Sequence, residues 1–219
     1  KLKEAQNIDP AGSLRRMKET VRDIDILISS EAPQKIMDEF TRLKDVKNVI
    51  AKGSTKSSIL TKDNIQVDVR VVDEASYGAS LMYFTGSKEH NIKLCQLAIK
   101  LGLKLNEYGI FKGEKRIAGK KEEDMYKALG LSYIEPELRE DRGELEAGAK
   151  GSLPYLLELK DIKGDLHAHS TWSDGGSSIE SMVIKARELN YEYIAITDHS
   201  QGLKIAGGLN SSKLDLKRK

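Results

Sequence analysis

Three aspartates at strand-like spacing carry the clearest chemical signal in the chain. Asp23 and Asp25 flank one isoleucine, and Asp68 lies in the valine-rich run 65–71. Alternate residues of a strand point to the same face, so the first two carboxylates emerge together and Asp68 takes the polar face of its own strand. Such carboxylates repel one another unless a divalent cation neutralises them, and Mg2+ prefers oxygen ligands of this kind. The pattern predicts a magnesium site suited to nucleotidyl transfer by two metal ions.

An Asp-x-Asp pattern on a strand also fits a solvated face or a loop cap. Aspartate is disfavoured in strands, however, so three of them within strands rich in valine and isoleucine favour a site. Upstream, Gly12 and Ser13 offer an exposed backbone and a hydroxyl, and Arg15 and Arg16 offer cationic forks that fit phosphate oxygens. We expect a triphosphate-binding segment there.

Three of the four histidines fall in a second cluster. His167 and His169 share one face of a predicted strand, Asp174 follows at its exit, and His199 follows a second, buried strand. A helical pattern over 179–189 separates the strands, which predicts a βαβ unit with these side chains at the carboxyl ends of parallel strands. Imidazole with carboxylate favours zinc, manganese or iron over magnesium.

The remaining elements must position these groups. Strands over 23–28, 49–51, 58–61 and 65–72, with a helix over 32–43, predict a small mixed sheet backed by helices. A second α+β module would contain a helix over 87–101, a hairpin turning at 112–114 and a helix over 121–128. The first of these helices is expected to begin at a Ser87 cap and to align Ile92, Cys95, Ala98 and Ile99 on one stripe. The module also carries basic residues that could track a phosphate backbone or form a solvated face, namely Lys112, Lys115, Arg116, Lys120 and Lys121.

Several stretches follow one another as they do in the family X DNA polymerases. They are GSLRR at 12–16, DIDIL at 23–27, GSTK at 53–56, VDVR at 67–70, YFTGS at 83–87, Asn91, NEY at 106–108 and ELRE at 137–140. On these residues the chain resembles the bacterial and archaeal members that carry a polymerase-and-histidinol-phosphatase (PHP) domain. The resemblance implies that Asp23 and Asp25 bind both metal ions. Asp68 would bind the catalytic ion and accept the proton of the primer 3′-hydroxyl, with Arg70 supporting the acidic cluster.

The same resemblance implies a nucleotide site built from two segments. Gly12, Ser13 and Arg16 would hold the phosphates of a dNTP. Tyr83 and Phe84 would form the turn beneath the sugar, and Gly86 would let the backbone approach the nucleotide. Asn91 would reach the minor-groove edge of the base. Two positions depart from the family pattern: Cys95 replaces a common template-contacting arginine, and Met17 replaces a common glycine. The change at Cys95 would affect template contact or fidelity, and the change at Met17 would affect the turn of the phosphate-binding segment.

The histidine segment resembles the opening of the PHP domain, a metal-dependent phosphoesterase barrel. The resemblance implies that His167 and His169 share one Mn2+ or Zn2+, that Asp174 and His199 serve another, and that phosphoesters at DNA 3′ ends or abasic sites are cleaved. Because an α/β barrel typically takes about 200 to 250 residues, we expect an incomplete metal site in this chain.

The expected fold is α+β, in a fragment of a longer protein. Its parts are a nucleotidyltransferase-like palm with a mixed sheet (1–73), a small α+β thumb (74–142), a charged, glycine-rich linker (143–163) and the first βαβ unit of a PHP-type barrel (164–219). The composition, 39% hydrophobic and 32% charged, fits a globular protein without a membrane span. The net charge of +2 requires any DNA contact to come from local basic patches. The lone Cys95 excludes an intrachain disulfide and fits the reducing cytoplasm.

Three functions follow from these patterns. The first is a template-directed DNA polymerase of the gap-filling repair type, acting on gapped or primed DNA and dNTPs. The second is a metal-dependent phosphoesterase or 3′-5′ exonuclease, in which the front half only holds DNA. The third is a DNA-binding fragment without turnover.

Overall fold

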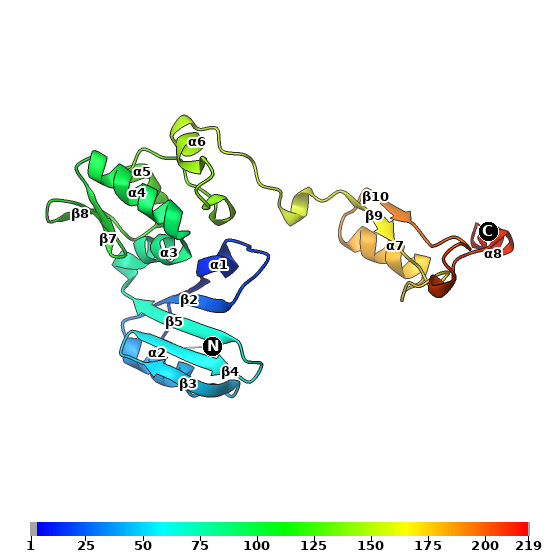
Figure 1. The fold of residues 1–219 in the computed structure, drawn as a ribbon, viewed down its shortest axis with the longest axis horizontal. Helices are drawn as coiled ribbons and strands as arrows, with labels where there is room; N and C mark the ends of the chain where they lie inside the picture. Colours follow the sequence, from blue (N-terminus) through cyan, green and yellow to red (C-terminus); the bar gives the residue numbers. More distant parts are fainter. Residues whose placement is uncertain (1–3, 219) are drawn as a thin grey trace. The chain divides into compact units, whose positions relative to one another are not determined.

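Alternating valines and isoleucines build the central strands of a five-stranded mixed sheet (Figure 1). The computed structural model describes residues 4–218, which divide into a first unit that ends at Leu153 and a second unit that begins at Pro154. The sheet of the first unit has the order β1-β2-β5-β4-β3; β2 and β5 pair in parallel and the other neighbours antiparallel. Its strands are β1 (Asn7–Pro10), β2 (Asp23–Ser29), β3 (Val46–Lys52), β4 (Lys56–Thr61) and β5 (Gln66–Val72). The predicted mixed sheet is confirmed, with β1 in addition.

The two faces of this sheet differ chemically. One face is covered by helix α2 (Pro33–Phe40) and forms a core in which each fully buried aliphatic side chain contributes about 1.5–3 kcal/mol. The members of this core include Ile28, Ile36, Met37, Phe40, Ile59, Val67, Val69 and Val71. The opposite face carries the aspartates of β2 and β5, and helix α1 (Gly12–Arg15) lies beside β2. Period-two alternation therefore separates the core from the acidic face.

Helices and a small antiparallel sheet complete the first unit. They are α3 (Tyr77–Thr85), α4 (Lys88–Lys100), β6 (Lys104–Asn106), β7 (Gly109–Lys112), β8 (Lys115–Ala118) and α5 (Glu122–Ala128). In Figure 1 these helices gather on one side of the five-stranded sheet, next to β2 and α1. They enclose a second core that includes Met82, Leu94, Ile110, Met125 and Ile134. The predicted hairpin and the helices before and after it are present.

The predicted stripe of α4 is not the face that packs into the core. Ser87 does cap the helix, since its Oγ accepts the backbone N–H of His90 at 3.3 Å. The buried residues of α4, however, are His90, Leu94 and Ala98, while Ile92 is 46% exposed and Ile99 72% exposed. Residues four apart share a helix face, and the polar His90 starts the buried row because it finds buried hydrogen-bond partners.

The segment predicted as a linker starts with a packed helix, α6 (Glu144–Lys150). Leu145 joins the second core, and Glu144 is buried against His90. Residues 144–153 thus belong to the first unit. The glycines and charges of this stretch suggested a linker, but tertiary contacts that a local pattern does not report hold it in place.

The second unit contains a parallel two-stranded sheet. Its elements are β9 (Gly164–Ala168), α7 (Ile179–Glu188), β10 (Tyr193–Ile196) and α8 (Ser211–Lys217). The predicted βαβ arrangement over 165–197 is confirmed.

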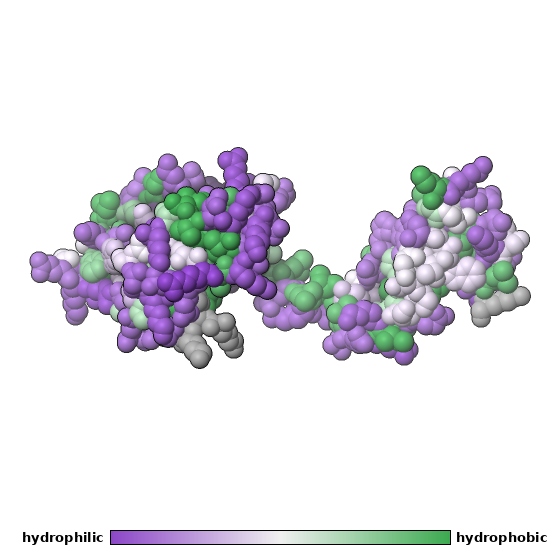
Figure 2. Space-filling model, turned by 90° about the horizontal axis from the view of Figure 1, so that it is seen from below, coloured by the Kyte–Doolittle hydropathy of each residue, from purple (hydrophilic) through white to green (hydrophobic). Residues whose placement is uncertain are grey.

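The surface seen in Figure 2 is largely hydrophilic, with hydrophobic groups interspersed. Among residues 4–218 we find no helix with the length and apolarity needed to cross a membrane.

Candidate active site

The acidic face brings the three predicted aspartates onto adjacent strands. In the parallel register of β2 and β5, Asp25 is opposite Asp68 and Asp23 is opposite Gln66. Gln66 Nε2 donates to Asp68 Oδ1 at 3.0 Å, and Lys56 Nζ lies 3.3 Å from Asp68 Oδ2. Strand pairing therefore sets the acidic groups side by side, as their alternation predicts.

Neighbouring charges affect these carboxyl groups differently. Burial raises the pKa of Asp25, and the charges of Asp23 and Asp68 raise it further. Burial also opposes ionisation of Asp68, but hydrogen bonds from Gln66, Ser58 and Lys56 hold its pKa below the usual value. A cluster of oxygen donors in which one carboxyl group resists ionisation fits a divalent cation, which would remove that repulsion.

Gly12 places α1 directly against the acidic face. Its φ is +59°, in the left-handed region that favours glycine, and a Cβ at this position would overlap Asp25 Oδ2. Met17, just after α1, has φ +55° and a side chain 73% exposed. This left-handed backbone explains why a glycine would suit the position.

One cavity of about 820 Å3 collects the residues predicted to bind nucleotide. It is lined by Ile92, Cys95 and Ile99 of α4 and by the predicted residues Gly12, Ser13, Arg16, Asp23, Asp25, Tyr83, Phe84, Gly86 and Asn91. Asp68 lines a smaller neighbouring cavity of about 130 Å3, together with Asp25 and Arg70. Asp25 lines both spaces. The exposed isoleucines of α4 are thus part of a cavity wall, and burial raises the pKa of the Cys95 thiol.

The aromatic pair lies in the last turn of α3 rather than in a separate turn. Tyr83 and Phe84 meet edge to face with ring centroids 5.3 Å apart. The Arg70 guanidinium lies 4.2 Å from the Phe84 ring centroid, a cation–π contact next to the aspartates. Asn91 Nδ2 donates to the Tyr83 carbonyl at 2.7 Å, and its Oδ1 is buried without a partner among residues 4–218. Asn91 also lines the cavity.

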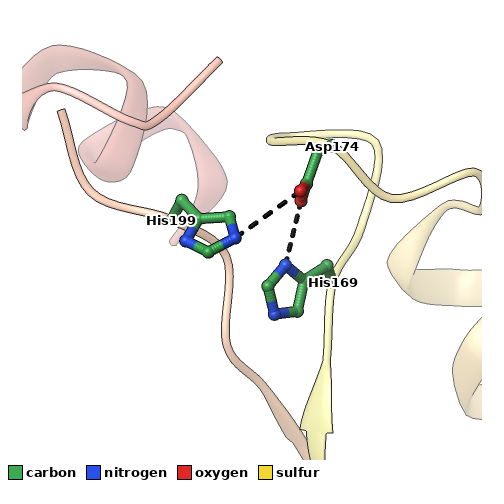
Figure 3. A group of neighbouring side chains, drawn as sticks. All are labelled: His169, Asp174 and His199. Carbon is green, nitrogen blue, oxygen red and sulfur yellow. Dashed lines mark hydrogen bonds and ion pairs between the residues drawn. The ribbon is translucent and has the colours of Figure 1, made fainter. Parts of the chain in front are cut away.

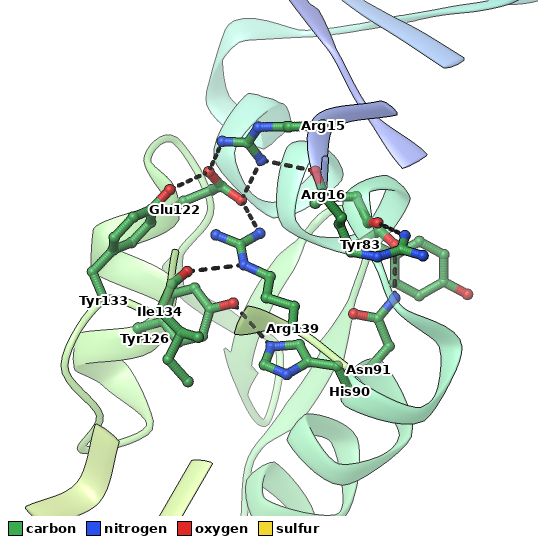
Figure 4. A network of polar contacts seen from close by, with 11 residues as sticks. Arg15, Arg16, Tyr83, His90, Asn91, Glu122, Tyr126, Tyr133, Ile134 and Arg139 are labelled. Atoms are coloured by element: carbon green, nitrogen blue, oxygen red, sulfur yellow. Dashed lines mark hydrogen bonds and ion pairs between the residues drawn. The ribbon is translucent and has the colours of Figure 1, made fainter. Parts of the chain in front are cut away.

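The paired arginines bind different carboxylates, and both also contact Thr85; Figure 4 shows Arg15 with Glu122. Arg15 donates to both oxygens of Glu122, at 2.9 and 2.6 Å, and to Thr85 Oγ1 at 2.8 Å. Arg16 donates through Nε to Glu140 Oε1 at 2.8 Å and through Nη1 to the Thr85 carbonyl. The sequence suggested phosphate binding for both. In the structure the carboxylate of Glu122 already neutralises Arg15.

A buried polar network surrounds these contacts, and the sequence did not indicate it. Arg139 is fully buried, donates to Glu122 Oε1 at 2.7 Å and to the Ile134 carbonyl at 2.9 Å, and has an Nη2 without a partner among the described residues. Nearby, His90 Nδ1 lies 2.6 Å from Glu144 Oε1, and His90 Nε2 lies 3.0 Å from the Tyr126 hydroxyl. No local sequence pattern joins residues so distant along the chain.

Figure 3 shows three of the predicted metal ligands in the second unit pointing toward one another. His169 Nδ1 lies 2.9 Å from Asp174 Oδ1, and His199 Nε2 lies 3.5 Å from Asp174 Oδ2. One ligand atom from each residue lies within 4.8 Å of the others, a spacing that a single transition-metal ion could bridge. His167 is not part of this group, but its ring stacks on His169 with centroids 4.9 Å apart. The structure therefore groups His169, rather than His167, with the other two.

Asp198, which had no role assigned from the sequence, binds the residues next to this cluster. Its side chain is 1% exposed and accepts hydrogen bonds from the Ser170 backbone, the hydroxyls of Ser170 and Ser173, and Lys217. Although burial opposes ionisation, these donors lower the pKa of Asp198 strongly. Because Asp198 directly precedes His199, these hydrogen bonds join the loop between His169 and Asp174 to the segment that carries His199.

Two family models match the chain. The DNA polymerase beta thumb matches residues 80–140, and the PHP domain matches residues 165–207. The Bacillus subtilis protein named DNA polymerase/3′-5′ exonuclease PolX is 43% identical over 93% of this chain. The Repair DNA polymerase X of an African swine fever virus isolate (Tick/Malawi/Lil 20-1/1983) is 30% identical and covers 62% of this chain.

The lengths covered differ between these relatives. The match spans 36% of the Bacillus subtilis protein and 82% of the viral protein. Among solved structures, the ternary P/T complex of Leishmania infantum polymerase beta is 25% identical with a TM-score of 0.55, covering 61% of this chain and 67% of that one.

Proposed function

Because this chain belongs to the family X DNA polymerases, we propose that it extends a primer 3′-hydroxyl with dNTPs on gapped or primed DNA. The observation that carries the proposal is the alignment of Asp25 with Asp68 on parallel strands beside a cavity lined by Gly12 and Arg16. Such an arrangement suits a triphosphate whose α-phosphorus lies close to carboxylate-bound cations.

Each residue of the acidic face has a role in this reaction. Asp23, Asp25 and Asp68 would hold Mg2+, which when bound would neutralise the triphosphate and polarise the primer hydroxyl. Asp68 would accept the proton of that hydroxyl. The 3′-oxygen would then bond to the α-phosphorus, and the bond from the α-phosphorus to the bridging oxygen would break and release pyrophosphate. Arg70, fixed over Phe84, would limit the repulsion among the carboxylates.

The cavity residues would hold the dNTP. The backbone of Gly12, the Ser13 hydroxyl and the Arg16 guanidinium would bind its phosphates, because charged and amide donors match phosphate oxygens. Tyr83, Phe84 and Gly86 would support its sugar. Asn91, which lines the same cavity, would lie at the minor-groove edge of the base. Basic residues of the β7–β8 hairpin would contact the DNA backbone. The protein would act in the cytoplasm, a location that its lone cysteine fits.

Substitution of Asp68 tests this function. Asp68→Ala should abolish Mg2+-dependent primer extension on a one-nucleotide gap while the protein still binds the DNA. Asp63→Ala, at an exposed position in the turn before β5, is the matched control and should extend normally. Persistent extension by Asp68→Ala would refute the metal assignment. Binding of gapped DNA by the wild-type chain without incorporation would favour a DNA-binding module instead.

The histidine cluster supports a second candidate activity, cleavage of phosphoesters at DNA 3′ ends with Mn2+ or Zn2+. Its carrying observation is the convergence of His169, Asp174 and His199. His169→Ala should remove Mn2+-dependent release of phosphate or nucleotides from a 3′ end and leave primer extension intact. Unchanged hydrolysis would exclude this cluster as the site.

A further inference from the structure

Arg16 lines the nucleotide cavity and is already held at two of its three nitrogens. Glu140 accepts from its Nε, and the Thr85 carbonyl accepts from its Nη1. Within residues 4–218 its Nη2 has no partner. A Cβ at Gly86 would lie 3.2 Å from Nη1, so the glycine leaves room for the guanidinium. One edge of the fork therefore remains for a ligand.

Glu140 is itself held firmly in place. Its backbone N–H donates to the Leu138 carbonyl at 2.9 Å, and the carbonyl of the preceding, buried Arg139 accepts from Ser87 at 3.0 Å. Its carboxylate also lies 3.5 Å from Lys18 Nζ. Burial opposes its ionisation, yet Arg16 and Lys18 lower the pKa of Glu140, so the group is anionic at neutral pH.

We propose that Glu140 is a positioning residue for the incoming nucleotide: it orients Arg16 so that the free edge of the guanidinium binds the triphosphate. The inference rests on the polymerase function proposed above. An arginine side chain has many rotamers, and ordering it on binding costs affinity. A guanidinium already fixed at Nε and Nη1 loses little further freedom when phosphate arrives, which is why its planar fork favours preorganised sites.

The opposite role for Glu140 would be competition. A carboxylate bound to the guanidinium could exclude phosphate, and its removal would then tighten nucleotide binding. The geometry favours positioning, because Glu140 contacts Nε and makes no hydrogen bond to Nη2, which keeps its N–H groups for a ligand. The two roles predict changes of opposite sign in the KM for dNTP.

Steady-state extension of gapped DNA by the full chain measures that sign. Glu140→Ala should raise the KM for dNTP roughly 3- to 10-fold with kcat within about twofold, the loss expected when one side chain must be ordered on binding. Glu140→Gln keeps an acceptor for Nε and should raise it less. Glu137→Ala, exposed in the same segment, is the control and should leave the KM unchanged. Should Glu140→Ala fail to fold, as judged by circular dichroism, Glu140→Gln decides.

Two further measurements separate positioning from other effects. In an Arg16→Ala background, Glu140→Ala should not change the KM further, because Glu140 acts through Arg16. Calorimetric titration with Mg2+ and inorganic tripolyphosphate, without DNA, should show the same weakening in Glu140→Ala. A lower or unchanged KM, or an equal further rise without Arg16, overturns the proposal. If the wild-type chain extends no primer, the polymerase function fails separately, and tripolyphosphate binding still decides the role of Glu140.

Discussion

Removal of the Glu122 carboxylate should destabilise the first unit severely. The side chain is 5% exposed and neutralises both Arg15 and the fully buried Arg139, and it also accepts from the Tyr133 hydroxyl at 3.2 Å. In Glu122→Ala, the hydrogen bonds of the Arg139 guanidinium to described residues would be reduced to the one from Nε to the Ile134 carbonyl, beside the rings of Tyr126 and Tyr133. A cation would then remain buried without a counter-charge.

The size of the effect follows from that uncompensated charge. Breaking a buried ion pair by removing one partner costs about 3–5 kcal/mol, against a total stability of about 5–15 kcal/mol for a domain. With a urea m value of about 2 kcal/mol/M, the midpoint of unfolding should fall by about 1.5–2.5 M. Glu123→Ala removes an exposed carboxylate from the same turn of α5 and should cost less than about 1 kcal/mol.

Urea titration of the full chain can follow both units at once. The first unit contains most of the helices and so contributes most of the far-UV circular dichroism, whereas the fluorescence of Trp172, the one tryptophan in the sequence, reports the second unit alone. The dichroism midpoint should fall in Glu122→Ala while the Trp172 transition stays in place. Equal midpoints for Glu122→Ala and Glu123→Ala would refute the view that the buried charges depend on Glu122.

Three other outcomes follow from single residues. Burial lowers the pKa of His90, so below the unfolded value near 6.5 the unfolded chain binds a proton that the folded chain does not. The free energy of unfolding should therefore fall from pH 7.5 to 5.5, by at most about 1.4 kcal/mol per pH unit. The urea midpoint should depend less on pH in His90→Gln. Asp198→Asn should weaken Mn2+ or Zn2+ binding at the histidine cluster roughly 10- to 100-fold in calorimetric titration, and unchanged affinity would contradict its supporting role. Gly12→Ala should lower the urea midpoint more than Gly102→Ala. Both positions have positive φ, but only a Cβ at position 12 would overlap the carboxylate of Asp25. Equal falls in the midpoint would show that this overlap is relieved.

The sequence predicted what depends on local periodicity. Alternation in β2 and β5 places Asp23, Asp25 and Asp68 on one face of the sheet, because the side-chain period of a strand is two and the opposite face is buried. The same reasoning found the strand, helix and strand that bring His169 and His199 together. The positions of these candidate ligands could therefore be inferred from spacing, except that His167 lies outside the group.

Contacts between distant segments could not be inferred in this way. The predicted α4 stripe lines a cavity through Ile92 and Ile99, and the core face of the helix is instead the one that carries His90, which partners on α5 and α6 bury. The residues around α6 were interpreted as a linker from their glycines and charges, although Glu144 is buried against His90 of α4 and Leu145 packs into the second core. Polar residues within cores are satisfied by tertiary partners, which leave no periodic signal.

Arg15 and Arg16 show how the structure divides two residues that the sequence presents as equivalent. Both follow Gly12 and Ser13, and both fit phosphate by chemical type. Glu122 binds Arg15 with both oxygens in a site shared with buried Arg139, so this arginine is committed to the stability of the first unit. Glu140 binds Arg16 through Nε alone and leaves Nη2 of this cavity-lining residue without a partner among residues 4–218. Loss of Glu122 should therefore appear in the free energy of unfolding, and loss of Glu140 in the affinity for nucleotide, because each carboxylate acts on a different neighbouring arginine.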